Sequence, residues 1–512
     1  MDLFNLNFER PDWGLVLPQL IVFLTAIALV LGDAFLPARR KFNALTGISL
    51  IGYGAALAAL YWQRGQDDMT FQGSFRADGL TIFLSIIILV AAILSVLVSA
   101  NYFEYYEDHA PLGEYYILLA FSIVGALMVS AAGDLIVIFI GLELSSLATY
   151  VLTAYARKRV ESVEGALKYF LLGIFASAIL LYGMAWAYGL SGSTDLDGIR
   201  AGISEAVTGN EYVEASVLLA LLLLVVGLGF KIAAVPFHMW TPDAYEGAPT
   251  PVSAYMSVIP KAAGFAALIR ILVQGLGPIS DDWTKLIAAL AVLTMTLGNI
   301  VALAQQNVKR MLAYSSIAHT GYMMVGLAAY QEGGALKETL STDGVTALLF
   351  YMLAYAFMNI GAFAVLAWLQ ERGRGVTLDE LSGLAGTHPL AALSMAVFMI
   401  SLMGIPPLIG FYAKYYVIVA AIEADMLWLA VAIVLMSALS AYFYLRVVFV
   451  MYFGKSDEGV QSKAALTPML NAGLMIMVVG NLVLGLFSPR ILDLGEEWSS
   501  ALTVATRIAG VK

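Results

Sequence analysis

Apolar runs of about 20 residues recur along this 512-residue chain, and they constrain its fold more than any other feature. Each run is long enough to cross ~30 Å of hydrocarbon as a helix. Continuous runs argue against a membrane β-barrel, whose strands alternate over ~10 residues. The sequence predicts an all-α polytopic membrane protein of about 14 helices, with approximate spans 14–32, 43–62, 79–100, 114–132, 134–154, 162–189, 214–240, 250–275, 284–306, 310–330, 344–370, 390–421, 427–452 and 466–487.

Composition agrees with a membrane environment. The chain is 61% hydrophobic and only 12% charged, whereas soluble domains carry about 25% charged residues. The polar stretches are too short for a large soluble domain, and no basic patch suggests nucleic-acid binding. There is no cysteine, which excludes disulfides and thiolate-bound iron–sulfur clusters. The first run, 14–32, is too long for a signal-peptide core, so we expect it to be retained.

Loop charges predict an orientation. Basic clusters follow the first, fifth and ninth predicted helices, at 39–41, 157–159 and 309–310. Acidic loops mark the other side, at 193–198, 279–283 and 330–334. Because lysine and arginine favour the cytoplasmic side, both termini are expected outside, in a bacterial cytoplasmic membrane. The loop 104–109 departs from this pattern, since it lacks basic residues on a side predicted to be cytoplasmic.

A weak internal repeat runs through the chain. The pairs Ser145-Ser146 and Ser315-Ser316 are 170 residues apart, and so are Pro236 and Pro406. Units of five helices change orientation between copies, so the pattern predicts two inverted repeats, as in many transporters. The expected organisation is N-terminal helices in 1–113, a first repeat in 114–275, a second repeat in 284–452, and a last helix with its tail in 453–512.

Ionisable residues fall inside several predicted spans. A charge at the bilayer centre costs ~2.5–3.5 kcal/mol, so it needs a partner, water or a function. Glu143 lies halfway along its helix, where a functional role is favoured over a purely structural one. Lys168 is four residues after Glu164, the spacing of a helical ion pair. It is also near the predicted interface, so a snorkelling lysine and a functional one remain open.

The stretch KIAAVPFHMWTPD combines a deep lysine with a helix breaker. Lys231 is seventeen residues past Glu214, roughly 25 Å along a helix. Pro236 should break the helix near residue 232, and the freed carbonyls must be buried in protein or face water. His238 follows. Its imidazole could pass protons, or it could simply bond at the interface, and both readings remain open.

Three further residues extend this set. Lys261 follows Pro260 in the middle of a span, His319 follows the second serine pair, and Lys414 follows the break at Pro406-Pro407. His319 on its own is read more readily as a satisfied buried histidine. Whether a buried lysine keeps its proton depends on the charges beside it. The set as a whole therefore suggests a proton relay, with water linking side chains on separate helices.

These motifs resemble a known family. The segment Phe230 to Ser253 with Lys261 resembles the signature of the antiporter-like subunits of complex I, which are related to subunits of multisubunit cation/proton antiporters. Further similar stretches are GLELSS (141–146), EGALKYF (164–170), KRMLAYSSIAH (309–319) and GFYAKYY (410–416). The resemblance covers roughly residues 114–450. The form of the first motif is most similar to the N type (subunit 2), and Lys414 stands where the M type has a glutamate.

The resemblance implies a fold of fourteen helices, in which helices 7 and 12 are broken. It implies that Glu143 pairs with Lys168, and that Lys231, Lys261 and Lys414 carry protons with help from His238 and His319. No redox cofactor is expected in this chain. NADH, FMN, iron–sulfur clusters and quinone would bind partner subunits, and the expected neighbours are an M-type subunit and small membrane subunits.

Three functions follow from these observations. The leading one is a proton-translocating subunit of NADH:quinone oxidoreductase, a non-redox part of a translocase driven by quinone reduction elsewhere. The alternative is a subunit of an Mrp-type antiporter without redox coupling. The third is a scaffold whose buried charges only fix helix packing.

Overall fold

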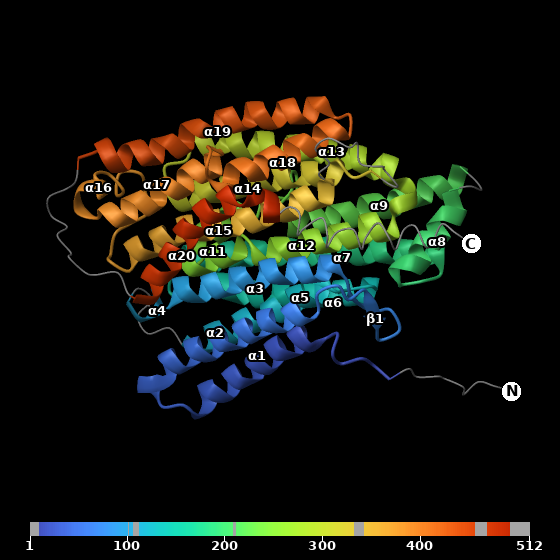
Figure 1. Ribbon diagram of the computed structural model, residues 1–512, viewed down its shortest axis with the longest axis horizontal. Helices are drawn as coiled ribbons and strands as arrows, with labels where there is room; N and C mark the ends of the chain where they lie inside the picture. Colours follow the sequence, from blue (N-terminus) through green and yellow to red (C-terminus); the bar gives the residue numbers. More distant parts are fainter. Residues whose placement is uncertain are drawn as a thin grey trace.

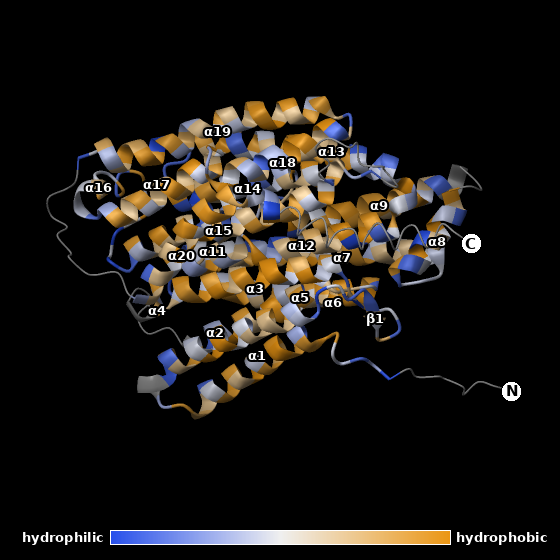
Figure 2. Ribbon diagram, in the orientation of Figure 1, coloured by the Kyte–Doolittle hydropathy of each residue, from blue (hydrophilic) through white to orange (hydrophobic). Residues whose placement is uncertain are grey.

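The computed structural model describes residues 10–100, 102–105, 112–207, 211–331, 343–455 and 468–491. Long helices run side by side along one axis of the molecule (Figure 1). The residues of these helices are largely hydrophobic, and many hydrophilic residues lie in the connections at the two ends (Figure 2). This distribution is the one that a bilayer imposes on a helical bundle.

Within the described residues, three long helices and a hairpin form the N-terminal part. They are α1 (Leu17–Phe35), α2 (Ala38–Trp62), β1 (Asp68–Thr70), β2 (Phe75–Ala77), α3 (Gly79–Ser99) and the short α4 (Tyr102–Tyr105). The two strands pair antiparallel, with Asp68 opposite Ala77. Asp78 caps α3 by accepting a hydrogen bond from the Thr81 amide, as N-terminal aspartates commonly do.

The first predicted repeat region contains α5 (Leu112–Ser130), α6 (Leu135–Thr153), α7 (Val160–Ser191), α8 (Leu196–Val207), α9 (Glu211–Lys231), α10 (Thr241–Gly247), α11 (Thr250–Met256), α12 (Ile259–Ile269) and the π-helix η1 (Arg270–Gly275), and the short η2 (Gly277–Ile279) follows it. The second contains α13 (Ser280–Leu303), α14 (Val308–Ala328), α15 (Gly344–Gln370), α16 (Leu384–Thr387), α17 (Pro389–Met403), α18 (Ile409–Glu423) and α19 (Leu427–Phe453), and α20 (Pro468–Leu486) follows.

The all-α membrane fold is confirmed. Within the described residues, twelve helical segments are long and apolar enough to cross a bilayer. The count of fourteen, the inverted relation of the repeats and the domain limits stay predictions. The small hairpin and the amphipathic α8 were not predicted from the sequence, because neither carries a long apolar run. Both predicted termini, and most of the 104–109 loop, lie outside the described residues.

Helices 7 and 12 are broken as predicted. The first half of helix 7 ends at Lys231 and the next helix begins at Thr241, while α17 and α18 are separated at 404–408. Backbone groups freed at the first break find partners within the protein. The Ile232 carbonyl accepts from Thr320 Oγ1 at 3.0 Å, and the Val235 amide donates to Thr294 Oγ1 at 3.0 Å. Irregular backbone is tolerated at this depth because it is buried and bonded.

The three predicted basic loops lie at one end of the bundle. Lys41 pairs with Asp33, and Asp33 lies directly against Gly113 at the start of α5. Arg157 pairs with Glu114, the next residue along α5. Arg310 pairs with Asp243 on α10, whose backbone packs against α7. We refer to this end as the basic end.

The opposite end is fastened by a buried ion pair. Arg270, the first residue of η1, donates to Asp78 through both terminal nitrogens, at 2.5 and 2.8 Å. It also donates to the Ser130 carbonyl at 2.9 Å and to Thr81 Oγ1 at 2.7 Å. One guanidinium therefore ties the start of α3, the end of α5 and the π-helix together. A planar bidentate pair of this kind fixes geometry as well as charge.

We predict that Arg270→Met destabilises the protein by ~3–5 kcal/mol, because Asp78 would remain buried without its cation. The measurement is thermal unfolding of the purified full chain. The double variant Asp78→Asn/Arg270→Met should recover about half of the loss, since no uncompensated charge is left. Arg157→Gln, which breaks an exposed pair, is the control and should cost below ~1 kcal/mol. Equal stability of Arg270→Met and Arg157→Gln would contradict the prediction.

Candidate functional site

Lys231 and Glu143 meet in the interior of the bundle. The Lys231 ammonium donates to Glu143 Oε1 at 2.9 Å and to the hydroxyls of Ser146 and Ser177 at 3.0 and 3.2 Å. Ser177 in turn donates to Glu143 Oε1 at 2.6 Å. The buried cation thus has three oxygen partners, one of them an anion, as a charge in a low-dielectric interior requires. Three helices, α6, α7 and α9, supply this cluster.

Lys261 has no carboxylate partner among its hydrogen bonds. Its ammonium donates to the Ser316 carbonyl and hydroxyl at 2.9 and 2.5 Å and to Thr320 Oγ1 at 2.9 Å. These partners lie one turn apart on α14, so a single helix face holds the ammonium. Thr320 also bonds to the Ile232 carbonyl, directly after Lys231. Lys231 and Lys261 are therefore joined through the break in helix 7 and one hydroxyl.

His319 lies at the centre of a buried aromatic cluster. Its Nε2 is 3.0 Å from the Tyr444 hydroxyl, and its Nδ1 is 2.8 Å from the Tyr351 hydroxyl. Tyr444 also bonds to Ser315, the neighbour of the serine that holds Lys261. Both ring nitrogens have a hydroxyl partner that can donate or accept, so either tautomer can be accommodated. Such an imidazole can take up a proton on one nitrogen and release one from the other.

Lys414 reaches back across the break in helix 12. Its ammonium donates to the carbonyls of Leu402 and Met403 at 3.0 and 2.9 Å and to Ser437 Oγ at 2.5 Å. Those carbonyls are the last of α17, where partial negative charge gathers. Gly404, with φ at +91°, turns the chain there, and a Cβ at this position would approach the Lys414 side chain to 3.0 Å. Glycine meets both requirements.

The two lysines at the breaks are placed differently. Lys231 is the last residue of the first half-helix, whereas Lys414 belongs to the second half-helix and folds back to the end of the first. Pro236 and Pro406 are matched in the sequence, but their lysines are on opposite sides of the breaks. Lys231 is balanced by a carboxylate, while the described partners of Lys414 are neutral oxygens and the Tyr322 ring, 5.1 Å away.

These groups form one file through the bundle, in the order Glu143, Lys231, Lys261, His319 and Lys414. Direct hydrogen bonds connect Glu143 to Lys231, and Thr320 bridges from that break to Lys261. The Tyr322 ring lies between the last two members, 5.6 Å from the His319 ring. Side-chain rotation or water is required at the interruptions. We call this set the buried file.

The implied pairing of Glu143 with Lys168 is wrong for this structure. Lys168 instead bonds to Glu164 and Asp243, at 2.7 Å each, and its side chain is 45% exposed. The physical reason is position along α7. Ser177, which touches Glu143, is nine residues further on, about 13.5 Å at 1.5 Å per residue. The helical Glu164–Lys168 pair suggested by the spacing is present.

His238 stands apart from the buried file. It lies in the non-helical segment between α9 and α10, its ring is half-buried, and Nδ1 has no hydrogen-bond partner among the described residues. Exposed Pro236 and Met239 flank it. His319, in contrast, is buried and bonded at both ring nitrogens, through the Tyr444 and Tyr351 hydroxyls.

A network of ion pairs at the basic end was not predicted from the sequence. Arg310 on α14 donates to Asp243 Oδ1 at 2.8 Å and to Glu246 Oε2 at 2.7 Å, both on α10. Asp243 also accepts a hydrogen bond from the Lys168 ammonium on α7. Glu246 accepts one from the Asn307 side-chain amide at 2.9 Å. The motif TPDAYEG contains both acids, so their three-residue spacing on one helix was the available signal. The network therefore fastens α10, which follows the break in helix 7, to α7 in the first repeat region and to α14 in the second.

Comparisons with known proteins agree on one family. The family profile described as "NADH:quinone oxidoreductase/Mrp antiporter, TM" matches residues 132–440. The NADH-quinone oxidoreductase subunit N of Trichlorobacter lovleyi is 42% identical and covers 96% of this chain and 97% of its own length. The subunit N of Desulfovibrio desulfuricans is 43% identical, and the match covers 94% of this chain and 95% of that subunit.

Solved structures are similar over nearly the whole chain. A chain of respiratory complex I from Thermus thermophilus with bound aureothin has a TM-score of 0.76 and 33% identity, covering 93% of this chain and 98% of its own. A chain of the Mrp complex from Dietzia sp. has a TM-score of 0.80 with 21% identity, covering 98% and 99%. The second likeness concerns the fold alone.

The network at the basic end leads to a prediction about local stability. Arg310→Gln removes one cation from two carboxylates that are partly exposed, so the expected loss is ~1 kcal/mol. Amide hydrogen exchange in α10 should then accelerate by about fivefold, because opening of that segment becomes easier. The control is Arg446→Gln, whose guanidinium contacts Gln306 rather than α10. Unchanged exchange in 241–247 would show that Arg310 does not fasten this helix.

Proposed function

The chain belongs to the NADH:quinone oxidoreductase/Mrp antiporter membrane family, in its subunit N group, and we propose from this that it translocates protons within a respiratory complex I. It acts there as a non-redox subunit of the translocase. Redox energy released by quinone reduction in neighbouring subunits drives protons through this one. The observation that carries the proposal is the buried file, a sequence of ionisable side chains that passes from helix to helix in the interior of the bundle.

The relay follows from the electrostatics of adjacent buried groups. Glu143 stabilises the charged form of Lys231, because an anion within hydrogen-bonding distance offsets the loss of hydration. When Glu143 is neutralised or drawn away, Lys231 loses that support and releases its proton towards Lys261. The hydroxyls of Thr320 and Ser316 are the contacts on the Lys261 side, and water carries the proton to them from Lys231, at a time when Lys261 is neutral. Protonation of one member thereby changes the proton affinity of the next.

His319 and Lys414 continue the relay in the second repeat region. His319 exchanges protons with the hydroxyls of Tyr351 and Tyr444, and water completes the step to Lys414. The carbonyls at the end of α17 stabilise Lys414 when it is charged. Lys168, on the exposed side of α7, serves at the entrance of the path from the basic end, next to Asp243. His238, close to the break in helix 7, assists only through water.

Electron transfer takes place elsewhere in the assembly. NADH, FMN, iron–sulfur clusters and quinone are expected in partner subunits, and this chain has no cysteine to ligate a cluster. The adjacent partners are an M-type antiporter-like subunit and small membrane subunits. The membrane is the bacterial cytoplasmic membrane, with the basic end facing the cytoplasm and both termini outside.

An Mrp-type antiporter subunit without redox coupling is the alternative. The Dietzia complex supports it through the fold, but the closely related sequences carry the subunit N name. Purification of the tagged chain from its native membrane separates the two. Flavin and iron–sulfur absorbance in the purified assembly supports complex I, whereas sodium/proton exchange without such cofactors would establish the antiporter.

We predict that Lys231→Ala in the assembled complex lowers the ratio of protons pumped to electrons transferred, and slows proton delivery through this subunit by at least ~10-fold. Glu143→Gln should also weaken pumping, because it keeps the side-chain shape and removes the charge. The measurement is proton uptake by proteoliposomes during quinone reduction. NADH oxidation by a soluble artificial acceptor should be unchanged, which controls for the redox partners, and the purified complex should still contain this chain, which controls for assembly.

Lys168→Ala tests the pairing found here. Since Glu143 bonds to Lys231 and not to Lys168, a double-mutant cycle should give a larger coupling between Glu143→Gln and Lys231→Ala than between Glu143→Gln and Lys168→Ala. Full pumping in Lys231→Ala, or a larger coupling to Lys168, would contradict the proposed order of groups.

A second prediction contrasts the two histidines. His319→Leu removes a group bonded at both ring nitrogens and should reduce pumping strongly, by about tenfold or more. His238→Leu removes a ring outside the hydrogen-bonded file and should leave at least about half of the activity. Proton uptake by the same proteoliposomes distinguishes them. Equal losses would mean that the path runs through the segment between α9 and α10.

A further inference from the structure

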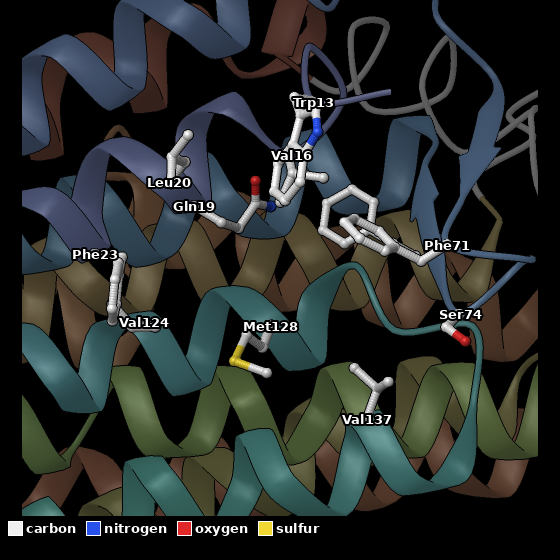
Figure 3. A pocket seen from close by; sticks show the side chains of 11 residues that line it. Trp13, Val16, Gln19, Leu20, Phe23, Phe71, Ser74, Val124, Met128 and Val137 are labelled. Carbon is white, nitrogen blue, oxygen red and sulfur yellow. The ribbon is translucent and has the colours of Figure 1, made fainter. Parts of the chain in front are cut away.

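An apolar groove lies on the side of the bundle, away from the buried file. It has a volume of about 440 Å³, within the range of small-ligand sites. Figure 3 shows its walls, which come from α1 and the residues before it, the β1–β2 loop, and the facing helices α5 and α6. Apart from Gln19 and Ser74, the lining side chains are apolar, among them Phe23, Met128 and Val137.

Hydrogen bonds and an aromatic contact fix the residues at the mouth of the groove. The Asp12 amide donates to Thr70 Oγ1 at 2.9 Å, and Gln63 Nε2 donates to the Gly14 carbonyl at 2.8 Å, so the segment before α1 is held at both sides. Trp13 packs edge-on against Phe71, with ring centroids 5.5 Å apart. Phe71 has a φ of +53°, a conformation that costs a non-glycine residue free energy. The loop therefore holds the Phe71 ring in place although its backbone conformation is locally unfavourable.

One polar group in the groove is unsatisfied. Gln19 is only 5% exposed, and its Oε1 has no hydrogen-bond partner within the part of the chain that the structure describes. Its amide extends among the lining side chains below Trp13 (Figure 3). A buried acceptor without a donor is unfavourable. An occupant that supplies an N–H or O–H would remove this deficit, whereas a plain hydrocarbon would not.

We propose that this groove binds one membrane phospholipid, with an acyl chain against the apolar walls and a donor-bearing headgroup at Gln19. The occupant is a lipid because α1 is a membrane-spanning helix whose side chains at Phe23 and Leu24 are exposed along the same surface. Trp13, 59% exposed at the mouth, is placed as tryptophans are at the headgroup level. Ethanolamine or glycerol headgroups carry the required donor, and choline does not.

The test uses the full assembled complex in nanodiscs of defined composition. The probes are phosphatidylethanolamine and phosphatidylcholine with identical acyl chains, and the readouts are retained lipid by native mass spectrometry and density in the groove by electron microscopy. We expect one retained phosphatidylethanolamine, preferred over phosphatidylcholine by about fivefold, the effect of one hydrogen bond. Gln19→Leu should abolish this preference while a lipid chain still occupies the groove.

A matched pair of variants separates this groove from the rest of the surface. Val137→Trp places an indole in the groove and should eliminate the retained lipid. Ile140→Trp, one turn along α6 and 51% exposed outside the lining, should leave it bound. Density for a protein side chain or helix from a partner subunit, absence of lipid in the unmodified complex, or equal retention of both lipids would each overturn the proposal.

Discussion

A cation in a bilayer is tolerated only when oxygen atoms replace the water it has lost, and this requirement organises the interior of the chain. Each deep lysine draws its partners from another helix or half-helix. Lys231 brings α6 and α7 to α9, Lys261 draws α12 to α14, and Lys414 joins the two halves of helix 12 to α19. The residues proposed to move protons are therefore also the residues that fasten helices together.

The helix breaks follow the same requirement, because each buried polar group that a break frees needs a hydrogen-bond partner. Backbone freed by Pro236 is bonded by Thr294 and Thr320, which belong to the other repeat region. Arg310, at the start of α14 in the second region, holds α10 of the first. The two halves are consequently not independent units. A movement of the helix 7 break must disturb the Thr320 hydroxyl, which also accepts from Lys261, so geometry in one half is communicated to the other.

Much of this arrangement could be predicted from the sequence, since membrane-spanning helices need long apolar runs and a proline inside one must interrupt it. The depth of Glu143, Lys231 and Lys414 was evident for the same reason. Their partners were not, because a linear pattern does not specify how helices rotate against one another. Lys168 shows the limit. Its i,i+4 partner Glu164 followed from spacing, but Asp243 is 75 residues away and reaches it only through the folding back of α10.

The side chain of Glu143 is 24% exposed, and on the same face of α6 its neighbours Ile140 and Leu147 are half-exposed and apolar. Left against acyl chains, a carboxylate at this depth would be costly and would open a leak for protons along the outside of the helix. A group that covers this face of α6 would separate Glu143, and the buried file behind it, from the lipid. A neighbouring subunit packed on this face would therefore serve assembly and would also shield the carboxylate from the acyl chains.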